Sequence, residues 1–137
     1  MYRHIKTFVL GAALSAFAGA LVSSAQSSRA IANVPFAFQT QGPVLEAGQV
    51  TVKEVNGQGV YQIMDRTGES TFWSASAKVT ADPQKPHLTF ACYGHNCVLA
   101  EIAMPGSNSA LRLSEAAITR QLPRKIGVAS MISASLR

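Results

Sequence analysis

The residue types most able to carry chemistry gather between positions 87 and 97, where His87, Cys92, His95 and Cys97 follow one another. Three kinds of site can be built from them. Two cysteines that face each other across a turn form a structural disulfide in an exported protein. A zinc ion needs four ligands at tetrahedral geometry. A redox dithiol usually places Cys-x-x-Cys at a helix N-terminus, which lowers a thiol pKa.

The spacing of the cysteines favours the disulfide. Apolar residues recur at every second position on both sides of residues 93–96, which predicts a β-hairpin over residues 87–104 with one buried face. Cys92 and Cys97 then lie opposite each other across the turn. Closing so small a loop stabilises the folded chain by roughly 2 kcal/mol in the chain-entropy model.

The metal and redox alternatives fit the same residues less well. A zinc site made of His87, Cys92, His95 and Cys97 would depend on the spacing Cys-x-x-His-x-Cys, which lacks the paired knuckles of zinc proteins. Four residues separate the two cysteines on a predicted hairpin, and this does not match a redox dithiol. We therefore expect neither a metal nor a cofactor.

No arrangement of residues in the sequence predicts catalysis. His95 with Glu101 or Glu115 and a serine would make a hydrolytic triad, but no Gly-x-Ser-x-Gly sequence or similar signature accompanies them. The seven Asp and Glu residues are spread singly, and nothing selects a pair for glycoside hydrolysis. We therefore expect a protein without enzymatic activity.

Aromatic side chains are better candidates for a binding site. Tyr61, Phe72, Trp73 and Tyr93 form a candidate ligand platform, because a large ring among Ala and Ser neighbours can line a groove for a sugar or an apolar ligand. The alternative, and the more common outcome, is that Trp73 fills a core whose other members are kept small.

Short strands must position these residues. Apolar residues alternate in most segments, and Asn56-Gly57 is the pair that two-residue hairpin turns prefer. Residues 110–122 have helical spacing. Either all of them form a helix, or 110–114 is a strand and only 115–121 is helical, with Ser114 as its cap, and we expect the second version. Strands are expected at 32–40, 49–55, 59–65, 70–80, in the hairpin of 87–104, at 110–114 and at 125–133.

These seven or eight short strands, with at most one short helix, predict an all-β fold. No long helix is available for the crossovers that parallel strands need. We therefore expect an antiparallel β-sandwich or a small β-barrel. The choice between the two depends on strand order, which the sequence leaves open.

The N-terminus predicts export. Arg3, His4 and Lys6 form a basic head, an uncharged apolar run continues to Val22, and Ser23-Ser24-Ala25 supplies small residues for a signal peptidase. A retained membrane anchor is the alternative. The apolar run is shorter than the roughly 20 residues that a bilayer span needs, and Gly and Ser interrupt it.

The expected domain organisation is a signal peptide at 1–25, a flexible lead-in at 26–31 and one β-domain at 32–137. We expect export to the periplasm or the extracellular space, and no membrane span after cleavage. Without Arg3 and Lys6, ten of the 12 Lys and Arg residues remain against seven Asp and Glu, a net charge of +3. These charges are scattered, so no basic stripe follows a phosphate backbone and we expect no nucleic-acid partner.

Several short motifs occur in a characteristic order. They are Pro-Phe-x-Phe at 35–38, Leu-x-Ala-Gly at 45–48 and Phe-x-x-Tyr-Gly at 90–94, followed by Ser114-Glu115. This order resembles a group of small exported proteins associated with acidobacterial genomes, over roughly residues 33 to 122. The cysteine pair, and Gln49-Val50 in place of a common aromatic, depart from that pattern. No activity is associated with the group, so the resemblance implies an exported β-domain and no catalytic residues.

These observations predict a non-enzymatic structural or interaction module of the cell envelope or the extracellular space. Its partner would be an unknown protein or envelope component. The alternative is a small β-barrel carrier that holds an apolar or carbohydrate ligand near Trp73 and Tyr93.

Intact-mass spectrometry of protein recovered from the export compartment tests the predicted processing. We expect a chain that starts at Gln26 and lacks two hydrogens, because the signal peptide is removed after Ala25 and Cys92 is bonded to Cys97. An uncleaved, fully reduced chain would contradict both the signal peptide and the oxidising compartment.

Overall fold

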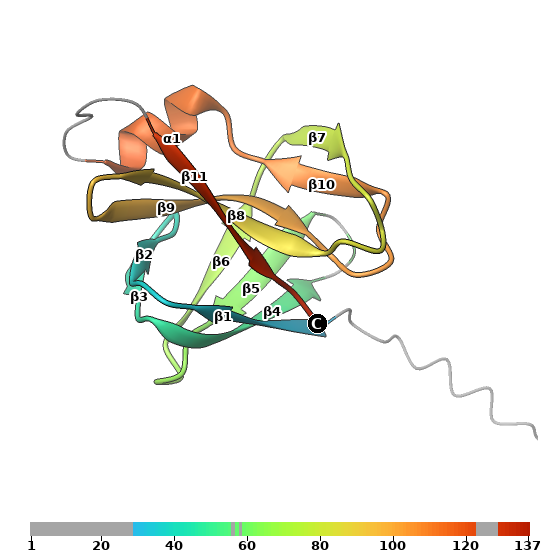
Figure 1. The fold of residues 1–137 in the computed structure, drawn as a ribbon, viewed down its shortest axis with the longest axis horizontal. Helices are drawn as coiled ribbons and strands as arrows, with labels where there is room; N and C mark the ends of the chain where they lie inside the picture. Colours follow the sequence, from blue (N-terminus) through green and yellow to red (C-terminus); the bar gives the residue numbers. More distant parts are fainter. Residues whose placement is uncertain (1–28, 56, 58, 123–128) are drawn as a thin grey trace, which may run out of the picture.

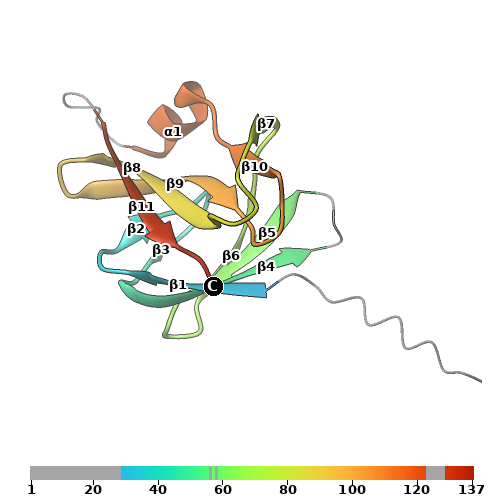
Figure 2. The same cartoon turned by 45° about the vertical axis from the view of Figure 1, so that its right-hand side comes forward.

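The computed structural model describes residues 29–55, 57, 59–122 and 129–137, and the expected signal peptide lies outside them. The described residues form eleven strands and one short helix, arranged as two sheets that face each other (Figure 1 and Figure 2). The all-β prediction is confirmed. The architecture is the sandwich, because the two sheets do not close into a barrel. Within the same ranges, no helix is long and apolar enough to cross a membrane.

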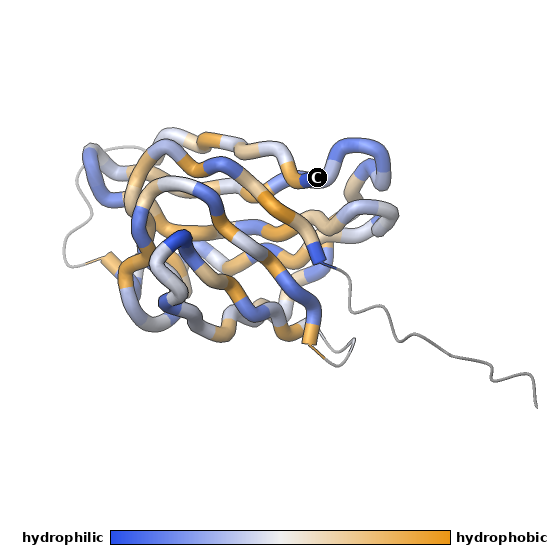
Figure 3. Tube along the Cα trace, turned by 90° about the horizontal axis from the view of Figure 1, so that it is seen from below, coloured by the Kyte–Doolittle hydropathy of each residue, from blue (hydrophilic) through white to orange (hydrophobic). Residues whose placement is uncertain are grey.

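The first sheet has the strand order β1-β4-β5-β6, with antiparallel pairing throughout. Its strands are β1 (Arg29–Val34), β4 (Gly48–Val55), β5 (Val60–Met64) and β6 (Ser70–Ser74). Buried and exposed residues alternate along them, and hydrophobic and hydrophilic segments alternate accordingly in Figure 3. One face therefore packs inward, and the other, which we call the outer face, meets solvent. The outer face carries Arg29, Ile31, Thr51, Lys53, Gln62, Met64, Ser70 and Phe72.

The second sheet contains seven strands in the described residues, with the main order β11-β8-β9-β10-β7. The short strand β2 joins it by pairing with β3 and, in parallel, with β9. The helix α1 (Glu115–Gln121) lies against this sheet on the side away from β1 and β4 (Figure 1). The strands are β2 (Phe38–Gln39), β3 (Val44–Leu45), β7 (Ala77–Thr80), β8 (His87–Tyr93), β9 (Asn96–Ala103), β10 (Ser109–Arg112) and β11 (Ser130–Ser135).

The predicted hairpin is present as β8 and β9, but the expectation of one buried face is wrong. A two-residue turn joins the strands at Gly94-His95, and the φ of Gly94 is 61°, a conformation that favours glycine. Every residue of β9 after Asn96 is buried. The second face is covered because α1 packs against β9 and buries Ile118 and Leu122.

The shorter of the two helical versions is confirmed. Ser114 caps α1, and its hydroxyl oxygen accepts a hydrogen bond from the Ala117 N–H at 3.2 Å. The residues before the cap form β10 instead of a further helical turn. The Leu113 N–H then donates to the Ala100 carbonyl at 2.8 Å, which fixes the start of the helix to β9.

Three predicted segments differ in their bounds. The strand expected at 70–80 is divided into β6 and β7, because its halves pair with β5 in one sheet and β10 in the other. The strand expected at 32–40 begins at Arg29, so the prediction of a flexible lead-in is wrong for residues 29–31. This strand ends at Val34, because Pro35 has no N–H to donate to a neighbouring strand. The last strand begins at Ser130, and the earlier part of its predicted range, 125–128, lies outside the described residues.

Trp73 links the two sheets in the core. Its side chain is fully buried, and its indole Nε1–H donates to the Leu99 carbonyl of β9 at 3.2 Å. Phe90 of β8 adds edge-to-face contacts with Phe36 and Phe38, at centroid distances of 5.1 and 5.0 Å. The interior between the sheets is therefore filled by side chains.

Each lateral edge of the first sheet is bonded to a segment outside the sheet. At β1, Ile31 and Arg137 exchange two backbone hydrogen bonds, of 2.9 and 3.0 Å. At β6, the carboxamide of Gln41 accepts from the Ser74 N–H and donates to the Ser74 carbonyl. This carboxamide occupies the place of a peptide group in a neighbouring strand, so it protects part of an open edge.

Asp65 organises the turn between β5 and β6. Its side chain is nearly buried and accepts hydrogen bonds from the Thr67 hydroxyl at 2.6 Å and from the N–H groups of Glu46, Thr67 and Glu69 at 2.9–3.2 Å. Burial alone raises the pKa of Asp65. The hydrogen bonds outweigh burial, and its pKa lies below the ordinary value of 3.8.

The substitution Asp65→Asn should lower the free energy of unfolding at pH 7 by about 1–3 kcal/mol, since it removes the charge that four donors face. The folded-state pKa is depressed, so this contribution is complete above the unfolded pKa and disappears as pH falls through the folded pKa. Urea unfolding followed by Trp73 fluorescence measures it.

The matched control is Asp82→Asn, because Asp82 is exposed and accepts one hydrogen bond, from the Gln84 N–H at 2.9 Å. A loss for Asp65→Asn that is no larger than that of the control, or that persists at pH 2, would contradict the role of the ionised carboxylate.

Candidate functional site

The cysteines of the hairpin form a disulfide. Cys92 and Cys97 are register partners at the tip of β8 and β9, with Cα atoms 4.0 Å apart and a bond between their sulfur atoms. Both are nearly buried, whereas His95 in the turn between them is exposed. The disulfide therefore fixes the hairpin tip and leaves only the turn residues in solvent.

The structure does not assemble the metal alternative. His87 pairs with Ala103 at the far end of the hairpin, five strand positions and about 17 Å from Cys92. The sulfur atoms of Cys92 and Cys97 are bonded to each other and so are not thiolate ligands. In the described part of the chain, no group of three or more His, Cys, Asp and Glu side chains could hold a metal ion.

A charged cluster forms instead around Glu101, which is buried in β9. Its carboxylate accepts from the Arg112 Nη2 at 3.0 Å and the Thr89 hydroxyl at 3.1 Å, and it meets the His87 Nε2 at 3.2 Å. The other ring nitrogen of His87 lies 2.8 Å from the Lys85 carbonyl. These contacts link β8, β9 and β10, and all of the partners of the Glu101 carboxylate belong to this chain. Glu101 lies five positions along β9 from Asn96, about 17 Å from the turn that holds His95, so the structure does not bring the predicted pair of His95 and Glu101 together.

Sequence reasoning missed this cluster, although a signal for it exists. Register pairs Glu101 with both Thr89 and Arg112, so an acid in a central strand has a hydroxyl and a guanidinium directly beside it. That pairing could be found only after the order β8-β9-β10 was known.

The four aromatic residues of the candidate platform do not gather into one site. Tyr61 and Trp73 are cross-strand neighbours with ring centroids 6.3 Å apart, and both face the core. Phe72 points from the opposite face of β6 and is 61% exposed. Tyr93 lies at the hairpin tip in the other sheet. The platform prediction therefore fails as a unit, and Trp73 takes the alternative role of a core residue.

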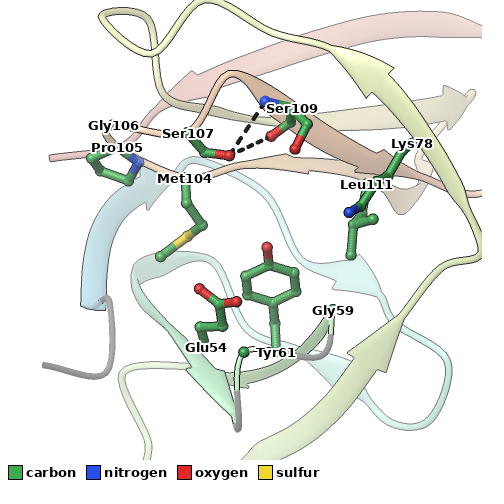
Figure 4. Close-up of a pocket in the computed structure, with 11 residues that line it drawn as sticks. Glu54, Gly59, Tyr61, Lys78, Met104, Pro105, Gly106, Ser107, Ser109 and Leu111 are labelled. Atoms are coloured by element: carbon green, nitrogen blue, oxygen red, sulfur yellow. Dashed lines mark hydrogen bonds between the residues drawn. The ribbon is translucent and has the colours of Figure 1, made fainter. Parts of the chain in front are cut away.

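A cleft of about 250 Å³ opens at one end of the sandwich (Figure 4). The first sheet contributes Glu54 and Tyr61, and β7 contributes Lys78. In Figure 4 the Tyr61 hydroxyl points toward the space below Ser107, in the loop after β9, and Ser109, the first residue of β10. The Ser107 hydroxyl donates to the Ser109 carbonyl at 2.8 Å. The cleft thus brings one phenol, one carboxylate and one ammonium group to the same end.

The polar side chains that line this cleft can form hydrogen bonds with a ligand. Burial raises the pKa of Tyr61, and the negative charge of Glu54 raises it further. The phenol is therefore protonated at neutral pH, and its O–H is available as a hydrogen-bond donor. Among the described lining residues, no hydroxyl nucleophile is hydrogen-bonded to a basic side chain.

The outer face of the first sheet holds a second depression, of about 280 Å³. Arg29, Thr51, Lys53, Gln62 and Met64 line it. Phe72 stands beside Gln62 in the register of β5 and β6, so its exposed ring borders the depression.

No protein-family model matches this chain, and no curated protein or solved structure matches it either.

Replacing both cysteines, Cys92→Ala with Cys97→Ala, should lower the free energy of unfolding by about 2 kcal/mol, the loop-closure term of the small ring. The fluorescence of the single tryptophan reports unfolding in urea. The native protein in reducing agent should lose a similar amount, whereas the double variant should not respond to the reductant. A response of the double variant would show that the disulfide is not the cause.

Proposed function

We propose that this protein is a non-enzymatic binding module of the exported class, and that it recognises an envelope or extracellular component through the outer face of its first sheet. The observation that carries the proposal is the exposed ring of Phe72 on a sandwich whose interior is filled. Export rests on the predicted signal peptide and agrees with the disulfide of the hairpin.

An exposed phenylalanine on an open sheet face favours a partner. Burying a Phe side chain stabilises a complex by about 1.5–3 kcal/mol. Met64, which is 37% exposed, lies diagonal to Phe72 on the same face and extends the apolar surface. Exposed apolar groups rimmed by polar residues are typical of interaction sites.

The carrier alternative has less support. Trp73 is 0% exposed, and its indole N–H is already bonded to Leu99. Tyr93 lies at the hairpin tip in the other sheet, and neither ring lines the cleft or the depression on the outer face. The buried carboxylate of Glu101 is held by Arg112, Thr89 and His87, so it is not free to act as a catalytic acid or base.

Photocrosslinking from the outer face tests the proposal. A benzoylphenylalanine introduced at Phe72 should give a covalent adduct with an envelope or extracellular component in cells that export the full chain. The matched control is the same probe at Val44, which is 56% exposed on a short strand of the other sheet. Equal adducts from both positions, or none from position 72, would contradict recognition through the outer face.

A further inference from the structure

The depression on the outer face lies within two rows of side chains that cross the first sheet, and Arg29, Thr51, Lys53, Gln62 and Met64 line it. Strand register places Arg29 beside Lys53, Lys53 beside Gln62, and Gln62 beside Phe72. The adjacent row contains Ile31, Thr51, Met64 and Ser70. Three inter-strand spacings make the first row about 14 Å long. This is a continuous surface with a cationic end and an aromatic end.

The polar side chains of this depression have no partners in the described residues. Arg29, Lys53, Thr51 and Gln62 make no side-chain hydrogen bond, and the two cations make no ion pair, within the described ranges. Two other arginines are ion-paired, Arg112 with Glu101 and Arg66 with Glu46. Within the described residues, Arg29 and Lys53 therefore present two unpaired cations side by side in the depression that Phe72 borders.

The charge of the two rows has a single sign. Arg29 and Lys53 lie side by side, and the other members of the rows are neutral. Without a carboxylate beside them, the two cations together attract an anionic group. A guanidinium binds a carboxylate through two parallel hydrogen bonds, and the adjacent ammonium adds a third.

We infer that the outer face binds an acidic oligosaccharide, with a uronate carboxylate on Arg29 and Lys53 and a sugar ring on Phe72. The hydroxyls of the sugar would meet Thr51 and Gln62, which can each donate and accept. The inference rests on the proposed function, because it names the ligand class of the same face.

The shape of the surface favours a saccharide over an acidic peptide. An extended peptide binds a sheet mainly through backbone groups at an edge. The depression instead lies over the middle strands, β4 and β5, whose backbone groups are used by the ladders on both sides. The C–H face of a pyranose can rest on the open Phe72 ring, and a length of about 14 Å suits a short chain of sugars.

Nuclear magnetic resonance titration of the folded β-domain in its full disulfide-bonded form tests the inference. The probe is tri-galacturonate, and maltotriose is the neutral trisaccharide for comparison. Tri-galacturonate should give saturable shifts at the amides of Thr51 and Gln62, and its affinity should fall as salt is added. Lys53→Gln and Phe72→Ala should each weaken binding about tenfold, the loss of one charge-assisted or stacking contact.

Lys85→Gln is the matched control, because Lys85 is an exposed lysine in the loop before β8. It should leave the affinity unchanged, and circular dichroism checks that every variant is folded. The inference is overturned if tri-galacturonate does not bind, if maltotriose binds equally well, or if Lys85→Gln weakens binding as much as Lys53→Gln. Tighter binding of a hexaglutamate peptide at the same amides would also overturn it.

The same titration separates this inference from the proposed function. Cleavage of tri-galacturonate, detected by mass spectrometry, would overturn the non-enzymatic proposal and leave the ligand class intact. Absence of binding, together with a crosslinked partner at position 72, would overturn the ligand class and leave the outer face as the recognition surface.

Discussion

The burial of Trp73 is the interaction on which the rest of the sandwich depends. Its indole fills the space between the sheets, and its N–H is satisfied by the Leu99 carbonyl, so that one residue of β6 is bonded to β9 in the other sheet. A buried N–H without a partner would cost about 1–3 kcal/mol. Because side chains alternate along a strand, a Trp73 that faces inward forces Phe72 to face outward. The same constraint therefore creates both the core and the exposed ring.

The sequence predicts local features of this fold well. The all-β class, the Ser114 cap and the pairing of Cys92 with Cys97 all follow from patterns within a few residues. The features of the fold that the sequence does not predict are those that depend on the order of the strands in each sheet. The division of 70–80 into β6 and β7 and the second buried face of β9 arise from partners far along the chain. The candidate platform failed for the same reason, because four aromatic residues of the right types lie on different faces and sheets.

The charged side chains of this protein lie in two kinds of surroundings. Glu101 and Asp65 are buried and surrounded by donors, which makes them part of the scaffold and removes them from chemistry. Arg29 and Lys53 are exposed side by side and make no ion pair within the described residues. A charge that stabilises the fold is surrounded by its own chain, whereas a charge available for recognition is not. This difference in surroundings distinguishes the charged residues that stabilise the fold from those that are exposed on its surface.

The hydrogen bonds between Ile31 and Arg137 join the first described strand to the end of the chain. The loop that they close is longer than one hundred residues, so the loss of chain entropy opposes this contact more than it opposes a local hairpin. During synthesis, β1 remains without this partner until Arg137 has been added. Protection of this edge of the first sheet therefore depends on residues from both ends of the described range.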